Sequence, residues 1–143
     1  MQTFLPYEDF AESARCLDNK RLGKQRVETM QLLTGNGWTN HPARKMWSGY
    51  NTALAVYGVI ICREWVSRGF TDTVELKIAH KWLHHTVPIS QDWLRTNEML
   101  PNWIGSKAFH DAHKSNLPRK DPVHYGRYRS QVSDDLPYVW PTV

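Results

Sequence analysis

The chain has 143 residues, of which 41% are hydrophobic and 22% charged, and its formal net charge is +4. This length predicts one domain, residues 1–143, with a core that needs neither a metal ion nor a disulfide. No apolar run approaches the roughly 18 residues of a membrane span, and the first residues lack the pattern of a secretory signal. We therefore expect a cytoplasmic protein that is not attached to a membrane.

The first third of the chain predicts two helices. A short one is expected at about 8–17. The second begins at Asp18, a residue type favoured at helix N-caps, and runs to Thr34. Gly35 and Gly37 end it, because glycine readily adopts the left-handed conformation that follows a helix.

A long apolar segment forms the middle of the sequence. Asn40 is expected to cap a third helix that continues, with a kink at residues 48–49, to a stop at Gly69. Residues 53–65 are apolar on nearly every side. A helix with this pattern is buried all round, so this segment is expected to be the central helix of the fold.

The second half of the chain predicts shorter elements. Asp72 has the position of a cap for a helix over residues 73–85, a short helix or turn is expected at 92–100, and a fifth helix at 107–115. The tail from Asp121 onward is expected to be coil. No segment alternates as a strand does, so the predicted fold is all-α: a compact single-domain helical bundle with a coil-rich C-terminal tail.

Positive charge is concentrated in two stretches. Residues 18–28 hold four of the eighteen Lys and Arg residues and residues 107–129 hold six, while the two stretches together contain only four acids. Such a distribution fits an anionic partner, although an ordinary solvated surface remains the alternative. Seven Trp residues, Trp38 among them, are more than one small core needs, so some are expected to stack on a ligand.

The stretch LDNKRLGKQRVE, residues 17–28, places one carboxylate, Glu28, among cations on a helix. The cations are Lys20, Arg21, Lys24 and Arg26. In one interpretation Glu28 is only the i,i+4 ion-pair partner of Lys24. In the other, the cations bind phosphates and the carboxylate stabilises a positively charged, sugar-like transition state.

Two further stretches carry candidate binding groups. In NHPARKMW, residues 40–47, His41 stands at a helix start and is followed by Arg44, Lys45 and Trp47; a phosphate could bind there, and a capped helix explains the same pattern without a ligand. The stretch from His110 to Lys120 supplies donors suited to phosphate and sugar oxygens, or is an ordinary helix end. Its candidates are His110, His113, Lys114, Asn116, Arg119 and Lys120.

Several chemistries have no support in the sequence. There is no P-loop, GxSxG, HExxH or CxxC motif, and Gly35–Asn36–Gly37 is too short to bind a triphosphate. The two cysteines, Cys16 and Cys62, have no motif spacing and are expected to be reduced core thiols. We expect neither a metal nor a cofactor.

The motifs LDxKxLxxxxxE, ending at Glu28, and NHPxxxMW at 40–47 resemble the pyrimidine-dimer DNA glycosylase/AP-lyase family of endonuclease V type. The likeness is strongest to its bacterial and phage branch, in which TFLPYEDF, HKSNLPRKDP and DDLPYVWP are familiar together. The resemblance implies a helical domain that extrudes a nucleotide from DNA. It also implies an N-terminal α-amine that attacks the sugar C1′, and a glutamate that assists base loss. These roles fall on Met1 and Glu28, while Val27 replaces the arginine that precedes the glutamate in characterised members.

The leading hypothesis is therefore a DNA glycosylase, with or without AP-lyase activity, that acts as a monomer on a damaged or modified base in duplex DNA. A non-catalytic nucleic-acid-binding domain and an enzyme of free nucleotides are the alternatives. The candidate catalytic residues are Met1, Glu28, His41, His110 and His113. We expect Glu28, His41 and the 110–120 segment to converge on one cleft.

Overall fold

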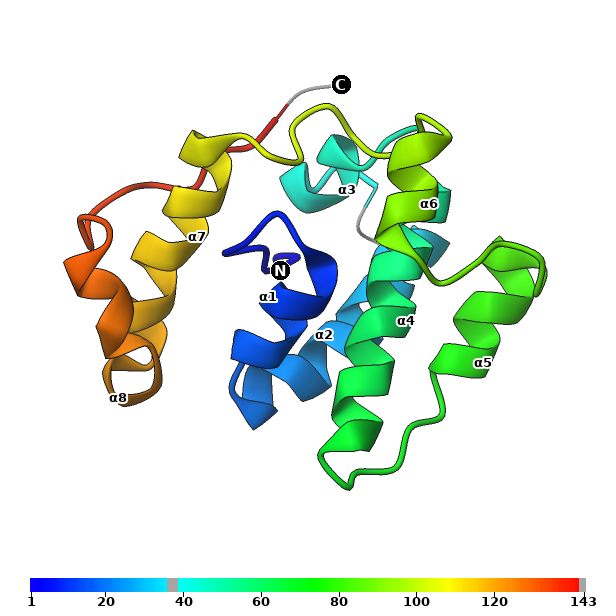
Figure 1. The fold of residues 1–143 in the computed structure, drawn as a ribbon, viewed down its shortest axis with the longest axis horizontal. Coiled ribbons are helices and arrows are strands. Elements are labelled where there is room, and N and C mark those ends of the chain that lie inside the picture. Colours follow the sequence, from blue (N-terminus) through cyan, green and yellow to red (C-terminus); the bar gives the residue numbers. More distant parts are fainter. Residues whose placement is uncertain (36–38, 142–143) are drawn as a thin grey trace.

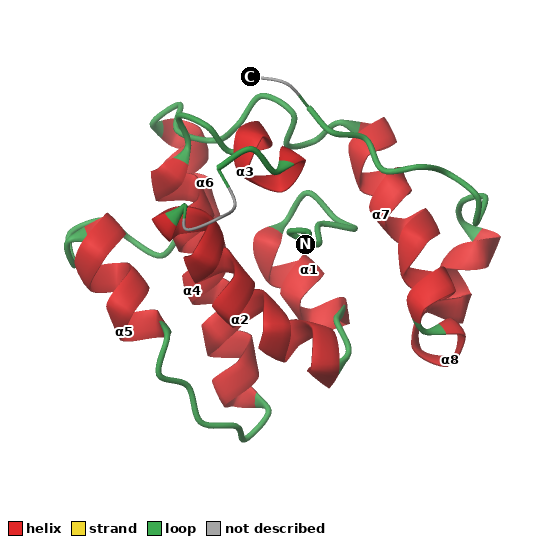
Figure 2. Ribbon diagram, turned by 180° about the vertical axis from the view of Figure 1, so that it is seen from behind, coloured by secondary structure: helices red, strands yellow, loops and turns green. Residues whose placement is uncertain are grey.

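The computed structural model describes residues 1–35 and 39–141, and every regular element in them is helical (Figures 1 and 2). The all-α prediction is confirmed. The helices are α1 (Phe10–Cys16), α2 (Asn19–Thr34), α3 (Pro42–Met46), α4 (Asn51–Ser67), α5 (Glu75–Ile78), α6 (Gln91–Thr96), α7 (Lys107–Lys120) and α8 (Pro122–Tyr125). A π-helical turn (Ala79–Leu83) extends α5, and a 3-10 turn (Gly126–Ser130) follows α8. None of these helices is long and apolar enough to span a bilayer.

Helix α4 is the centre of the body, as the apolar segment 53–65 predicts. Residues 53–59 are all buried, and α4 packs against α2, α1 and α5. Two glycines allow α2 and α4 to approach closely. A Cβ on Gly58 would lie 2.7 Å from Cγ2 of Thr29, and a Cβ on Gly23 would lie 2.9 Å from Cη2 of Trp65. Because both contacts are already tight, they fix how α2 packs against α4.

The predicted third helix is two helices. The chain turns after Met46, Gly49 adopts a φ of +83°, and α4 starts afresh at Asn51. The cap of α3 is His41, whose Nδ1 accepts the N–H of Ala43 at 3.0 Å, and not Asn40. The expected kink is therefore a full break, because glycine permits a left-handed turn there.

The C-terminal region is more helical than predicted. Helix α7 continues beyond Ser115 to Lys120, because burial of Leu117 and Pro118 offsets the backbone hydrogen bond that proline cannot make. The region expected to be coil contains α8 and the 3-10 turn, whose Tyr125 and Tyr128 are buried. The Asp72 cap is confirmed, since its Oδ2 accepts the N–H of Glu75 at 2.8 Å. The second predicted stop, Gly37, lies outside the described residues.

Residues 2–6 are buried without belonging to a helix, and they run through the middle of the molecule between α7 and the other helices (Figure 1). Their backbone groups are paired with side chains. Nδ1 of His113 accepts the N–H of Leu5 at 3.0 Å, and Nδ1 of His110 contacts the carbonyl of Leu5 at 2.8 Å. The amide oxygen of Gln25 accepts the N–H of Phe4 at 3.0 Å. This segment is therefore fixed from several directions.

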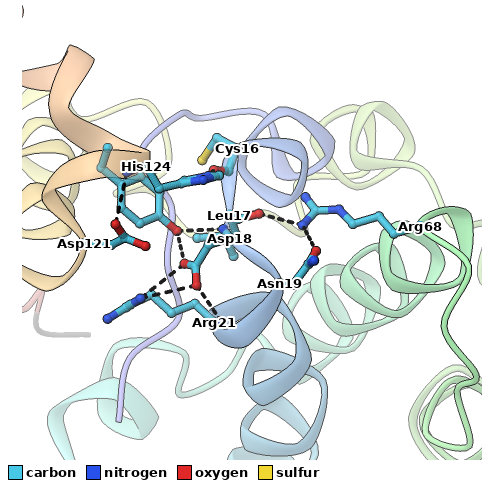
Figure 3. A network of polar contacts seen from close by, with 9 residues as sticks. Cys16, Leu17, Asp18, Asn19, Arg21, Arg68, Asp121 and His124 are labelled. Carbon is cyan, nitrogen blue, oxygen red and sulfur yellow. Dashed lines mark hydrogen bonds and ion pairs between the residues drawn. The ribbon is translucent and has the colours of Figure 1, made fainter.

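The start of α2 is anchored equally firmly (Figure 3). The carboxylate of Asp18 accepts hydrogen bonds from Arg21 and from the hydroxyl of Tyr125, and that hydroxyl accepts the N–H of Asp18 at 2.8 Å. From the opposite side, Arg68 on α4 donates to the carbonyl of Leu17 at 2.7 Å and to Oδ1 of Asn19 at 2.9 Å. These contacts hold the first turn of α2 between α4 and α8.

The first prediction concerns the pH dependence of folding. Burial, with a smaller effect from His110, lowers the pKa of His113 from 6.5 to about 3. Between these two pKa values the unfolded chain binds more protons than the folded one. The free energy of unfolding is therefore highest above pH 6.5 and decreases as the pH falls toward 3. Asn at this position can still accept the N–H of Leu5 but does not titrate. Between pH 7.5 and 4.5, urea unfolding should show that the wild type loses about 2–3 kcal/mol more than His113→Asn. If the wild type and His113→Asn lose the same amount of stability, burial does not lower the pKa of His113.

Candidate functional site

A pocket of about 270 Å³ lies where the N-terminal segment meets α2, the end of α7 and the C-terminal tail. Both ends of the chain contribute to its wall. The lining residues are Met1, Gln2, Phe4, Lys20, Arg21, Lys24, Gln25, Glu28, Lys120 and Tyr138. Six of them are candidates from the sequence: Met1, Lys20, Arg21, Lys24, Glu28 and Lys120.

Helix α2 supplies the charged wall of this pocket. Lys20, Lys24 and Glu28 are spaced by four positions and Arg21 precedes Lys24 by three, so these side chains lie on one side of the helix. Arg21 is paired with Asp18. In the described part of the chain Glu28 forms no ion pair with Lys24; its Oε2 lies 3.4 Å from Nε2 of Gln25. The geometry thus favours a carboxylate facing the pocket over a simple surface ion pair.

The opposite wall is formed by Lys120 and Tyr138. Partial burial, together with the positive charges of Arg21, Arg119 and Lys24, lowers the pKa of Lys120. Its Nζ lies 6.0 Å from the ring centre of Phe4. The pocket therefore contains an amine that loses its proton more readily than an ordinary surface lysine.

The position of Tyr138 depends on a clamp that α7 forms on the tail. Ser115 accepts the N–H of Leu136 at 2.9 Å, and Asn116 donates to the carbonyl of Leu136 at 3.0 Å. Arg119 donates to the same carbonyl. Two predicted nucleic-acid contacts, Asn116 and Arg119, thus bind the protein's own tail in this structure.

His41 does not line the pocket, but it is close to it. Its ring lies edge-on to Trp140 at 6.0 Å between centroids, and Nδ1 caps α3. Burial and the positive charge of the nearby Met1 α-amine lower the pKa of His41. Met1 therefore lines the pocket and is also near His41.

Four other predicted site residues form contacts within the protein. His110 and His113 contact the backbone of Leu5 through their Nδ1 atoms and do not line the pocket. Trp47 is fully buried, and its indole N–H donates to Oγ1 of Thr3 at 3.0 Å. Arg26 lies on a different face of α2, where it pairs with Asp72 and packs on a Trp ring. In this structure these four side chains contact other groups of the protein and do not line the pocket.

The remaining candidate cations lie outside the pocket. Arg44 donates to Oδ1 of Asn51 at 2.9 Å, Lys45 is exposed on α3, and Nζ of Lys114 lies 4.7 Å above the ring of Tyr7. Trp38 lies outside the described residues. Among the described residues, no group of three or more His, Cys, Asp or Glu side chains is placed to hold a metal ion.

A larger hollow of about 600 Å³ lies between α1, α4 and α6. Its lining mixes charges of both signs, and Arg95 pairs there with Asp92 and Glu8. Such a lining is nearly balanced in charge and attracts no particular anion. The smaller pocket has four cations and one carboxylate, and we take it as the candidate site on these chemical grounds.

Comparison with known families gives one match. A family model described as pyrimidine dimer DNA glycosylase matches residues 1–78, which include Met1 and Glu28. Because the match covers more than half of the chain, the protein belongs to the pyrimidine dimer DNA glycosylase family. No curated protein and no solved structure matched the chain in the corresponding searches. The family implies DNA as the substrate.

Sequence reasoning missed four of the lining residues: Gln2, Phe4, Gln25 and Tyr138. Gln25 could have been found, because it precedes Glu28 by three positions and so lies on the same helix face. Tyr138 could not, because only the folded tail brings it to α2.

The second prediction concerns the salt dependence of DNA binding. If the four pocket cations contact phosphates, log K should fall with log salt at a slope of about −4. Lys24→Ala should reduce the slope to about −3, whereas Lys77→Ala, on exposed α5, should leave it unchanged. Fluorescence anisotropy with a labelled duplex between about 50 and 200 mM salt measures both. Equal slopes for the two variants would remove the pocket from the DNA interface.

Proposed function

We propose that the protein is a DNA glycosylase that cleaves the N-glycosidic bond of a damaged or modified base in duplex DNA, and that residues 1–143 act as one domain. The observation that carries this proposal is the carboxylate of Glu28 in a pocket lined by four cations. The pocket uses both ends of the chain, which is why we treat the chain as one functional unit.

The chemistry follows from the charges. As the glycosidic bond breaks, its electron pair leaves with the base and positive charge develops at C1′ of the sugar. A carboxylate fixed beside that carbon stabilises the charge, because it needs no reorganisation during the reaction. Lys20, Arg21 and Lys24, together with Lys120 where it is protonated, bind the flanking phosphates. Extruding the nucleotide costs a few kcal/mol, which phosphate contacts and stacking on aromatic side chains offset.

Two alternative functions, an enzyme of free nucleotides and a non-catalytic binding domain, can be distinguished from a glycosylase. An enzyme of free nucleotides needs only one phosphate site, whereas this pocket has cations on two elements: Lys20, Arg21 and Lys24 over about one turn of α2, and Lys120 at the end of α7. A binding domain without chemistry would need no carboxylate among its phosphate contacts. Glu28 therefore separates the enzyme from the binder.

The third prediction tests that residue. Glu28→Gln keeps the size of the side chain and removes its charge. It should abolish base release while DNA affinity stays equal or rises, because a negative charge beside phosphates has gone. The measurement uses a panel of labelled duplexes carrying uracil, a thymine dimer, an abasic site or a modified base. The matched control is Glu64→Gln on α4, which should remain active. An active Glu28→Gln protein would refute the proposal.

AP-lyase activity needs an amine; the pocket is lined by those of Met1, Lys20, Lys24 and Lys120, and two of these four are the candidates. The α-amine of Met1 is the one that the family resemblance implies, and Lys120 is the second. Either would add to C1′ of an abasic sugar and lose water to form an imine, after which loss of a C2′ proton expels the 3′ phosphate. The lowered pKa of Lys120 leaves more of it in the neutral, nucleophilic form.

The fourth prediction identifies the amine. Borohydride reduction on an abasic duplex should trap a covalent adduct, and mass spectrometry of its peptides should locate the adduct on Met1 or Lys120. Acetylation of the α-amine should abolish a Met1 adduct, and Lys120→Arg should abolish a Lys120 adduct while keeping the charge. Base release from a duplex of the panel, with no adduct on the abasic duplex, would instead indicate a glycosylase that uses water.

A further inference from the structure

Gln25 makes an unusual set of contacts at the base of the pocket. Its side chain is only 1% exposed, and Nε2 donates to the carbonyl of Gln2 at 2.6 Å and toward Oε2 of Glu28 at 3.4 Å. Its Oε1 accepts the N–H of Phe4 at 3.0 Å and the hydroxyl of Tyr57 at 2.7 Å. The two donors and the two acceptor positions of the amide are therefore all used.

These partners fix the orientation of the amide. The backbone N–H of Phe4 can only donate, so the oxygen must face it, and the carbonyl of Gln2 can only accept, so the nitrogen must face that. One rigid group thus contacts the backbone beside residue 1 and the carboxylate of Glu28. No other standard side chain of this size donates twice and accepts twice from one planar group.

We propose that Gln25 is a positioning residue, whose amide holds the N-terminal segment and the Glu28 carboxylate at a fixed separation around the reacting sugar. This inference rests on the proposed glycosylase function. The contact to Glu28 is long for a hydrogen bond, as catalytic contacts often are before the substrate binds and tightens them. Gln25 touches no substrate in this role and acts through its two neighbours.

The chain offers a matched control in Tyr57. Its fully buried hydroxyl has one proton, which is shared between Oε1 of Gln25 at 2.7 Å and the carbonyl of Phe4 at 2.9 Å. Tyr57→Phe therefore removes a bond from the same amide but leaves both Nε2 donations in place. Any effect of general loosening should appear in Tyr57→Phe as well, whereas an effect of positioning should appear only when Nε2 is lost.

The fifth prediction compares single-turnover base release from a thymine-dimer duplex. Gln25→Met should slow the chemical step by roughly tenfold to a hundredfold, the usual effect of a small misplacement of a reacting group. DNA affinity should stay within about twofold, since no phosphate contact is lost. Tyr57→Phe should keep the rate within about threefold of the wild type, even if its melting temperature falls as far as that of Gln25→Met.

Two further variants separate positioning from stability. Gln25→Glu keeps the acceptor for Phe4 and Tyr57 but has no N–H, and should lose the rate at least as strongly as Gln25→Met. In a Glu28→Asp background the shorter carboxylate is already out of reach of Nε2, so adding Gln25→Met should slow the reaction by at most about twofold more. If a higher DNA concentration restores the rate of neither Gln25→Met nor Gln25→Glu, the defect lies in the chemical step and not in binding.

The outcomes distinguish the two proposals. If Gln25→Met and Gln25→Glu release the base at the wild-type rate, or if both fail to fold while Tyr57→Phe folds, Gln25 is not a positioning residue. If the effects of Gln25→Met and Glu28→Asp simply add, the coupling between them is absent and the proposal fails. An active Glu28→Gln protein, in contrast, overturns the glycosylase assignment itself.

Discussion

The structure depends on one constraint: residues 2–6 are buried in a helical protein without being helical themselves. A buried backbone N–H or carbonyl without a partner costs about 1–3 kcal/mol, so each must be paired by something other than a helix. Gln25, Tyr57, His110 and His113 supply those partners from three different helices. The burial of the polar side chains of Gln25, His110 and His113 is thus explained by the route of the N-terminal segment.

The same constraint builds the candidate site. To pair with the N-terminal segment, α2 must present Gln25 to it, and this turns the neighbouring face of α2, with Lys24 and Glu28, toward the first residues. Close packing at Gly23 and Gly58 prevents α2 from rolling on α4. The carboxylate and the N-terminal segment therefore have a defined geometry before any DNA is bound, which is the condition for electrostatic catalysis.

The sequence predicted what local periodicity determines and missed what tertiary contacts determine. The span of α2, the central position of residues 53–65 and the charged face at 17–28 follow from spacing alone. His110 and His113 were candidate catalytic groups, because a sequence does not show whether a polar side chain faces a ligand or a backbone. The path of the tail depends on three side chains of α7 that grip Leu136, and no periodicity encodes such a contact.

The tail clamp has a consequence for how such a pocket can diversify. The carboxylate and the three cations of α2 lie within the 78 residues that match the family, whereas Lys120 and Tyr138 lie beyond them. One wall is therefore set by the helix packing of the core, and the other by a segment attached through Leu136. In the proposed glycosylase, changes in the tail would alter the shape and polarity of the space offered to a base without disturbing the helices of the core. A common reaction centre would in this way be combined with different preferences for the base.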